Sequence, residues 1–362
     1  MKSALPIPVR GVGVLLTALS LAASPSAASP SAAGTEVGTS VGEGRPARTT
    51  SAWLPWWGGD GALDDALQHA SQLHTVSPFW YEATSDTTVD GYPGAGDQRI
   101  VDQLHGKGIK VVPTVIETPG AEAMAELLGD PVRRTAHADA LMAVAASAAY
   151  DGLDLDYERM AETDDEQLRE RVRVGYDALT GELCARLHAG DKQCVVTVMP
   201  RTRDSGQAYD YAHLGRVADR VRIMGYNLHD ALGRPGPLSS LAWYEEFLGY
   251  ATGVVPREKL EVALPAYGWD WTVGSTDRAK HVTSTEAEAL RRDRQAAYVF
   301  DEASGTPHFT YTDGGRRHEV WYQDAHGSAA HLAAMGKYGV RNSGLWALGF
   351  EDPGLWQALA QQ

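Results

Sequence analysis

The sequence predicts an α/β fold, a (β/α)8 TIM barrel with a small α+β insertion between its seventh and eighth strands. Short apolar segments of strand character alternate with helical segments eight times between Ser51 and the C-terminus. Such alternation is typical of parallel sheets with helical crossovers. A doubly wound dinucleotide-binding fold would carry G-x-G-x-x-G after an early strand, and the sequence has no such fingerprint. The closed barrel is therefore favoured.

The predicted barrel strands are short and mostly apolar. Residues 109–116 are almost wholly apolar, as expected of a parallel strand covered on both faces. In chain order, the strands are expected at residues 52–57, 75–81, 109–116, 151–158, 194–199, 221–227, 260–267 and 341–348.

The clearest predicted helix follows the fourth strand. Thr163-Asp-Asp-Glu166 resembles a capping box, apolar residues recur at helical spacing, and Gly190 ends the pattern. Other helices are expected at residues 63–67, 100–104, 134–149, 209–217, 241–250 and 352–359. The catalytic barrel would thus occupy residues 51–362, interrupted by the insertion at 272–325. Within the insertion we expect a helix at 286–294 and strands at 297–300, 309–312 and 319–322, forming a wall on the rim.

The charge balance limits the partners. Lys and Arg together number 32 and Asp and Glu 47, a formal net charge of −15. Such a surface disfavours nucleic acid and anionic membranes and suits a neutral substrate. The sequence does not specify an oligomeric state, and a monomer is the default expectation.

The N-terminus has the pattern of an export signal. Lys2 and Arg10 precede the apolar run Gly11–Ala23, and small residues follow up to Ala33. We expect cleavage within residues 1–33, a flexible linker at 34–50, and a secreted, extracellular product. A stable membrane anchor is not expected, because the apolar run is too short to span a bilayer comfortably.

The chain has two cysteines, Cys184 and Cys194, which leave two alternatives. An exported protein meets an oxidising environment, where a disulfide would tie the end of a helix to the next strand. Two buried free thiols are the other possibility.

The fourth strand carries a row of carboxylates. In Asp151-Gly-Leu-Asp-Leu-Asp-Tyr-Glu158, alternation places Asp154, Asp156 and Glu158 on one face and apolar side chains on the other. Buried carboxylates are costly, and a row of them raises the proton affinity of its last member, as a general acid requires. Asp151 has the opposite parity and is expected to support the strand's entry.

Two other interpretations of this segment are weaker. A solvated acidic loop would not alternate with apolar residues, and a calcium loop needs a glycine where Tyr157 and Glu158 stand. Because the active sites of such barrels lie at the C-terminal ends of the strands, Glu158 is expected at the mouth, with Asp156 and Asp154 progressively deeper.

Asp151-x-x-Asp154-x-Asp156-x-Glu158 resembles the signature D-x-x-D-x-D-x-E of glycoside hydrolase family 18, the chitinases and related N-acetylglucosaminidases. Met224-Gly-Tyr226-Asn227 resembles the family's M-x-Y-D, and Trp346 resembles its final-strand tryptophan beneath the sugar. The resemblance covers residues 51–362. It is nearest to the branch of spore cortex peptidoglycan hydrolases and chitobiase, to which the runs Pro307–Tyr311, His318–Asp324 and Tyr338–Trp346 are similar.

The resemblance implies the following roles. Glu158 would be the general acid and base, Asp156 would orient the substrate's N-acetyl group, and Asp154 would hold or share the proton of Asp156. Tyr226 would hydrogen-bond the acetamido oxygen, which attacks the anomeric carbon in place of a protein nucleophile. No metal or organic cofactor is required. Asn227 departs from the family's aspartate, which puts the pH profile or the preference at this subsite in question.

Further substrate-binding candidates stand at or near predicted strand ends. Aromatic rings there can stack on sugars, although each can equally pack in the core. The binding candidates are Trp346, Asn227, Met224, Tyr81, Trp57 and Tyr267, and Trp80, Trp269 and Trp271 lie close by in the sequence.

The expected function is that of a secreted, retaining hydrolase. It would cleave β-1,4 linkages after N-acetylglucosamine in chitin-type oligosaccharides or peptidoglycan, by substrate-assisted catalysis. The alternative is a non-catalytic glycan-binding (lectin-like) or inhibitor protein on the same fold. N-glycans also offer the required sugar, and the choice between endo and exo action stays open.

Overall fold

The computed structural model describes residues 48–361 of the 362-residue chain. The predicted signal at 1–33 and nearly all of the predicted linker at 34–50 lie outside these residues. The first strand begins at Thr49, inside the predicted linker, because Thr49 and Thr50 already pair with the last barrel strand.

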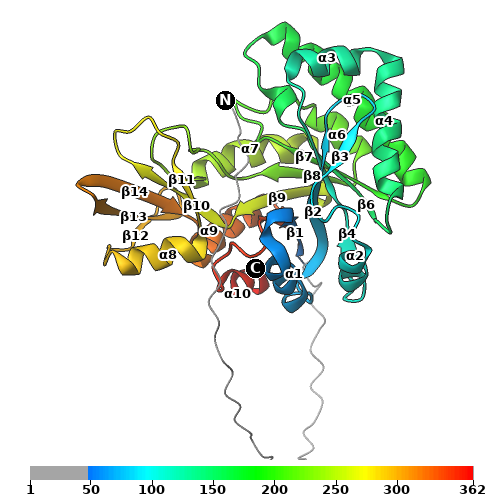
Figure 1. Ribbon diagram of the computed structural model, residues 1–362. Helices are drawn as coiled ribbons and strands as arrows, with labels where there is room; N and C mark the ends of the chain where they lie inside the picture. Colours follow the sequence, from blue (N-terminus) through cyan, green and yellow to red (C-terminus); the bar gives the residue numbers. More distant parts are fainter. Residues whose placement is uncertain (1–47, 362) are drawn as a thin grey trace, which may run out of the picture. The chain divides into compact units, whose positions relative to one another are not determined.

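The large sheet is a closed parallel barrel, as predicted (Figure 1). Each barrel strand pairs with the next in space, and the last strand pairs with the first. In chain order the barrel comprises β1 (Thr49–Pro55), β2 (Leu73–Ala83), β4 (Lys110–Val111) with β5 (Thr114–Glu117), β6 (Gly152–Asp156), β7 (Gln193–Val198), β8 (Arg220–Met224), β9 (Leu260–Pro265) and β15 (Asn342–Trp346), while β3 (Val89–Gly91) adds to the edge of β2.

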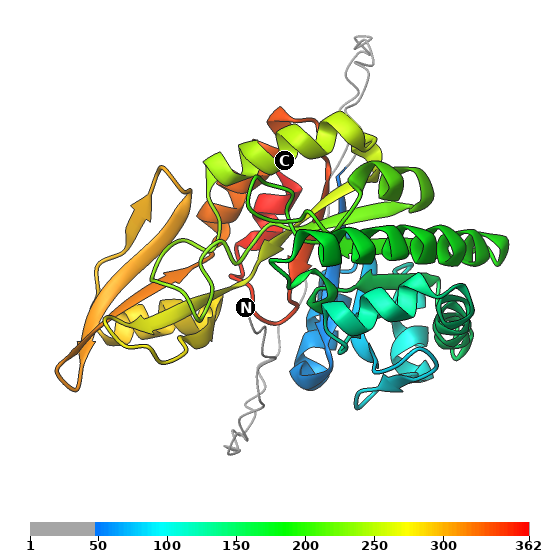
Figure 2. The same cartoon turned by 90° about the horizontal axis from the view of Figure 1, so that it is seen from above.

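Helices cover the barrel and bury its outer side chains. The longest, α5 (Glu166–Ala189), packs against α3 and α4 and is seen lengthwise in Figure 2. Its N-cap is Asp165, which accepts the backbone N–H groups of Gln167 and Leu168, and not Thr163 as the predicted capping box required. The other covering helices are α1 (Gly59–Gln68), α2 (Gln98–His105), α3 (Ala121–Gly129), α4 (Pro131–Ala146), α6 (Tyr211–Val217), α7 (Leu241–Val254), α9 (Ala325–Lys337) and α10 (Leu355–Ala360).

The insertion is a five-stranded antiparallel sheet with one helix. It begins at Tyr267, five residues before the predicted boundary, because the segment predicted to end the seventh barrel strand turns at Ala266 and pairs antiparallel with two insertion strands. The insertion contains β10 (Tyr267–Thr272), β11 (Lys280–Thr283), α8 (Ser284–Asp293), β12 (Val299–Asp301), β13 (Thr306–Asp313) and β14 (Arg316–Tyr322).

Cys184 of α5 and Cys194 of β7 form a disulfide, which confirms the first of the two alternatives. The bond joins a covering helix to the strand that follows it. Within residues 48–361, no helix is both long and apolar enough to cross a membrane.

Candidate active site

The acidic strand β6 alternates as predicted. Asp154 and Asp156 are buried inside the barrel, whereas Leu153, Leu155 and Tyr157 pack outward among the helices. β6 lies between β5 and β7 in parallel register, so its C-terminal end opens at the same rim as theirs. The inward carboxyls are thus stacked along the barrel interior.

Asp151 supports the entry of this strand, as expected from its parity. Its Oδ2 accepts the backbone N–H of Val111 at 2.7 Å and lies 2.8 Å from His105 Nε2. These contacts join β6 to β4 and α2, away from the carboxyls inside the barrel.

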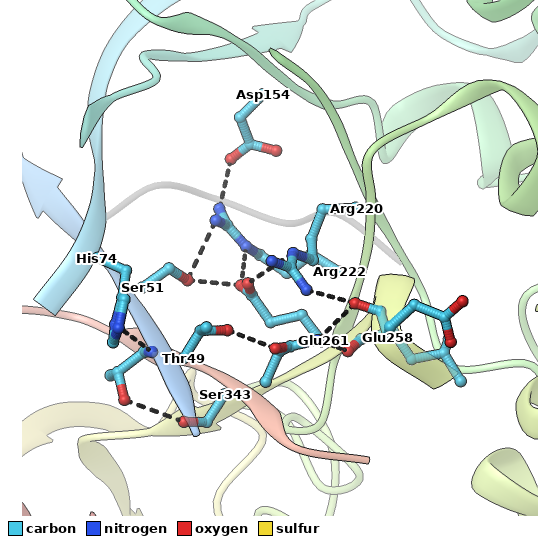
Figure 3. A network of polar contacts seen from close by, with 12 residues as sticks. Thr49, Ser51, His74, Asp154, Arg220, Arg222, Glu258, Glu261 and Ser343 are labelled. Carbon is cyan, nitrogen blue, oxygen red and sulfur yellow. Dashed lines mark hydrogen bonds and ion pairs between the residues drawn. The ribbon is translucent and has the colours of Figure 1, made fainter. Parts of the chain in front are cut away.

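Asp154 lies deepest in the row, and its contact with the guanidinium of Arg222 is drawn in Figure 3. Its Oδ2 accepts from Arg222 Nη1 at 2.8 Å and from Thr114 Oγ1 at 2.8 Å, and its Oδ1 accepts from Thr197 Oγ1 at 2.8 Å. Burial raises the pKa of Asp154, while the Arg222 charge and the two hydroxyls oppose that rise. No hydrogen bond joins Asp154 to Asp156 among the described residues, so Asp154 does not share a proton with Asp156 in this arrangement.

Asp156 stands above Asp154 and is differently placed. Its Oδ1 is buried without a hydrogen-bond partner in the described part of the chain. Burial, followed by the negative charges of Glu158, Asp154 and Glu117, raises its pKa well above the ordinary value. Asp156 therefore holds a proton more tightly than an ordinary aspartate does.

Glu158 follows the strand and is half-buried at the rim, where it is the N-cap residue of the 3-10 turn Arg159–Ala161. Burial, reinforced by the carboxylate of Glu162, raises its pKa to about 7. A carboxyl with that pKa holds its proton near neutral pH and can also accept one, which is the property of a general acid and base.

Glu117, the last residue of β5, positions Glu158. It is buried, and its two oxygens accept the backbone N–H groups of Glu158 at 3.0 Å and Met160 at 2.7 Å. Burial raises its pKa well above the ordinary value, although the backbone donors oppose the rise. The turn that carries Glu158 is thereby fixed to the neighbouring strand.

Met224, the last residue of β8, and Tyr226, two residues later, belong to one buried apolar cluster, and Tyr226 also lies near Asp156. Both are buried, and the Tyr226 ring lies 6.0 Å from that of Tyr267. Burial, with the charge of Asp156 next, raises the pKa of Tyr226 well above its ordinary value, so its hydroxyl remains a donor. Tyr226 therefore faces the carboxyl row with its proton in place.

Asn227 ends this segment with a φ of 63°, in the left-handed region that asparagine tolerates. Its Oδ1 accepts from Tyr267 Oη at 2.5 Å and from Trp269 Nε1 at 3.3 Å. Because both rings belong to β10, Asn227 links the barrel rim to the insertion, and Tyr267 holds it there from the start of the second sheet.

An aromatic cluster lies at the ends of β1, β2 and β15. The Trp346 ring is half-buried, 5.5 Å from Trp53, 5.1 Å from Phe79 and 6.3 Å from Trp57. Trp57 is also half-buried, so both candidates keep partly exposed rings near the rim.

Tyr81 does not join this cluster, and its prediction as a substrate-binding residue is wrong. Its hydroxyl lies 2.8 Å from that of Tyr150, and its ring packs in the outer core beneath the helices. The register of β2 shifts between Phe79 and Tyr81, and such an irregularity turns the following side chain to the other face. Phe79 occupies the inward position instead.

Sequence reasoning did not identify Glu117, Arg222 or Glu261. A signal for Arg222 was present, since it shares strand parity with Met224 and Tyr226 and should point inward with them. Glu261, in an otherwise apolar strand, offered a similar signal. Their partners could not be inferred, because they come from distant strands.

A closed parallel barrel with a row of inward carboxyls ending in a perturbed glutamate at the rim is an arrangement typical of glycosidases. Residues 98–351 match the family "Glycosyl hydrolases family 18". The chain therefore belongs to that family, as its signature predicted.

Individual relatives agree with the family. An uncharacterized glycosylase, YvbX, of Bacillus subtilis (strain 168) is 28% identical over 231 residues, which are 61% of this chain and 64% of that protein. The cortical fragment-lytic enzyme of the same organism is 28% identical over 208 residues, 55% of this chain and 48% of that enzyme. The chain thus spans roughly half to two thirds of their lengths. A crystal structure of chitinase from Chromobacterium violaceum ATCC 12472 superposes with a TM-score of 0.77 at 25% identity, covering 87% of this chain and 98% of that one.

Proposed function

We propose that the protein is a secreted, retaining glycoside hydrolase that cleaves β-1,4 linkages after N-acetylglucosamine in chitin-type oligosaccharides or peptidoglycan. The observation that carries the proposal is Glu158, whose pKa of about 7 and position at the rim suit proton donation to a glycosidic oxygen. The family membership supports the class of reaction, and the N-terminal sequence pattern supports export.

In the proposed reaction the substrate supplies the nucleophile. Glu158 protonates the leaving glycosidic oxygen while the acetamido oxygen attacks the anomeric carbon and gives an oxazolinium ion. Asp156, whose Oδ1 has no protein partner, accepts the acetamido N–H, and the Tyr226 hydroxyl donates to the attacking oxygen. Water then opens the ring after losing its proton to Glu158, so the configuration is retained. Intramolecular attack can supply about 7 to 11 kcal/mol of the barrier.

The catalytic assignment is tested with Glu158→Gln, which keeps the shape and removes the acid. We expect kcat on a chito-oligosaccharide to fall by about 10²- to 10⁴-fold. The matched control is Glu166→Gln, an exposed carboxylate of the first turn of α5, which should leave kcat unchanged. Hydrolysis by Glu158→Gln at the wild-type rate would show that Glu158 is not the acid.

The substrate is decided by a second experiment. Similarity to a chitinase and to a cortical fragment-lytic enzyme favours chitin and peptidoglycan as the two glycans to compare. Digesting both in parallel, with mass spectrometry of the released ends, should give N-acetylglucosamine reducing ends. Muramic acid as the sole reducing end would exclude the proposed cleavage position.

A further inference from the structure

Beneath the proposed catalytic carboxyls lies a polar group that we call the floor network: Ser51, Ser77, Asp154, Arg222 and Glu261. Figure 3 shows four of these residues, all but Ser77. Its centre is the guanidinium of Arg222, a side chain only 1% exposed. Nη1 donates to Asp154 and to Ser77 Oγ at 3.1 Å, Nη2 donates to Ser51 Oγ at 3.1 Å, and Nε donates to Glu261 Oε1. Five barrel strands thus meet at one buried cation.

The hydrogen bonds around Asp154 identify its protonation state. A carboxylic acid proton needs an acceptor, but Arg222 has none to offer. Thr114 Oγ1 already accepts from the indole N–H of Trp53 at 3.0 Å, so its own proton is directed to Asp154. With Thr197 donating on the other side, the donors suit an ionised Asp154.

We propose that Arg222 is a positioning residue that fixes the negative charge of the carboxyl row on Asp154 and thereby leaves the proton on Asp156, directly below Glu158. The row then carries one negative charge below the substrate site, where it offsets the positive oxazolinium ion. Proton sharing between the two aspartates is not needed for this state. The effect on the oxazolinium ion rests on the proposed function, whereas the negative charge on Asp154 does not.

Few other ionisable groups lie near Asp154, and from α5 the hydroxyl of Tyr176 is one of them. On β6 the neighbour is Asp156, on β9 it is Glu261, and on β8 it is Arg222. The neighbouring strands β5 and β7 present only the hydroxyls of Thr114 and Thr197 to its oxygens, and β1 and β2 contribute Ser51 and Ser77 to the guanidinium. Glu117 at the end of β5 and Glu158 act on Asp156 above it. Arg222 is therefore the cation that favours the charged form of Asp154.

The kinetic test is the acid limb of the kcat/KM profile, which reports loss of the row's negative charge. In Arg222→Met this limb should move up by about 1 to 2 pH units, because an adjacent cation that lowered the pKa is gone. Arg222→Lys keeps the charge and should leave the limb within about half a unit of wild type. An unmoved limb in a folded Arg222→Met protein, or an equal shift in both variants, would overturn the proposal.

Arg222→Met leaves the buried Glu261 with Ser51 and the more distant Arg220 as partners, so folding is a concern. The double variant Arg222→Met/Glu261→Met removes both charges together and keeps apolar volume in their place. Its acid limb should also move up. If only the double variant folds, an acid limb at the wild-type position in that protein overturns the proposal.

A measurement without substrate separates this proposal from the proposed function. Full-length protein labelled with 13C at aspartate Cγ is titrated by NMR, and the Asp154 signal is assigned by its loss in Asp154→Asn. The signal should stay that of a carboxylate through neutral pH in wild type and titrate about 1 to 2 units higher in Arg222→Met. Absence of glycan hydrolysis would reject the proposed function alone, whereas a protonated Asp154 at neutral pH would reject this inference alone.

Discussion

Buried carboxyls occur in two regions of the barrel interior, and their surroundings differ. In the floor network, Asp154 and Glu261 are paired with Arg222 and with hydroxyl donors. Nearer the rim, the carboxyls of Asp156, Glu158 and Glu117, which we call the mouth carboxyls, have backbone N–H groups as partners or none. The floor is a satisfied ionic network, whereas no ion pair within residues 48–361 involves the mouth carboxyls, and Arg222 acts on Asp156 only from a distance.

This difference separates two uses of burial. A buried ion pair contributes little net stability but is costly to break, because one partner is left charged and unpaired. An unpaired buried carboxyl instead gains proton affinity, which destabilises the folded protein at neutral pH but supplies acids and bases for catalysis. Removing Asp156, whose Oδ1 has no partner among the described residues, should therefore stabilise the protein at neutral pH, whereas removing a floor carboxyl should destabilise it.

The largest effect is expected for Asp156→Asn. Asparagine keeps an acceptor oxygen for the acetamido N–H but cannot gain or lose a proton, and kcat should fall by about 10²- to 10⁴-fold. Stability should change in the opposite direction. The pKa of Asp156 is raised in the folded protein. Asp156 therefore lowers the free energy of unfolding only above its pKa in the unfolded chain, about 4, and lowers it more as the pH rises.

Urea unfolding of Asp156→Asn at two pH values checks this sign. The variant should match wild type at about pH 4 and exceed it at about pH 7. Lower stability than wild type at both pH values would contradict the description of the mouth carboxyls.

In the floor network, Glu261→Ala should destabilise the protein by about 3 to 5 kcal/mol, because it leaves Arg222 buried with one carboxylate fewer. Thermal or urea unfolding measures the loss. Most of it should be recovered in Arg222→Met/Glu261→Met, since exchanging a whole buried pair for apolar groups is often neutral or stabilising. A double variant as unstable as Glu261→Ala would show that packing, and not the unpaired charge, causes the loss.

Glu117→Gln tests the mouth carboxyl whose two oxygens both accept backbone N–H groups. An amide has one acceptor oxygen, so one of the N–H groups of Glu158 and Met160 would face the NH2 group of glutamine. The unsatisfied donor costs about 1 to 3 kcal/mol, and a displaced Glu158 should lower kcat by about 10- to 100-fold with little change in KM.

The control for Glu117→Gln is Glu286→Gln, whose carboxylate also accepts a backbone N–H, that of Thr283 in the insertion. This variant should lose a little stability and no activity. Equal kcat losses in the two variants would mean that Glu117 does not act through the position of Glu158.

The barrel and the inward row of carboxyls were predictable from the sequence because both depend on local patterns. Strand parity alone places Asp154 and Asp156 inside and Tyr157 outside. The contacts that distinguish floor from mouth are not local. Arg222 reaches Asp154 and Ser51 across 68 and 171 residues of sequence, and only the closed barrel brings these positions together.

Two predictions, the inward position of Tyr81 and the start of the insertion, failed because strand register and strand partners cannot be read from local sequence patterns. The parity of Tyr81 fails because β2 has a register shift before it, and residue types do not reveal that shift. The insertion begins early because the Tyr267–Thr272 segment has strand character in either sheet, and only its antiparallel partners determine which one it joins.

The smallest effect is expected for Asn227→Asp, which restores the family residue at the rim. The indole N–H of Trp269 can only donate, so it fixes the side-chain oxygen of Asn227 and directs the Nδ2 group away from both rings. Aspartate keeps both hydrogen bonds and tolerates the left-handed backbone, so stability should change by less than about 0.5 kcal/mol. The added charge lies near Tyr267, which interacts electrostatically with Glu158. A second negative charge there should raise the pKa of Glu158 and move the alkaline limb of the kcat/KM profile to higher pH. Profiles on a chito-oligosaccharide measure this shift, and a kcat loss as large as that of Asp156→Asn would instead assign Asn227 a direct part in the reaction.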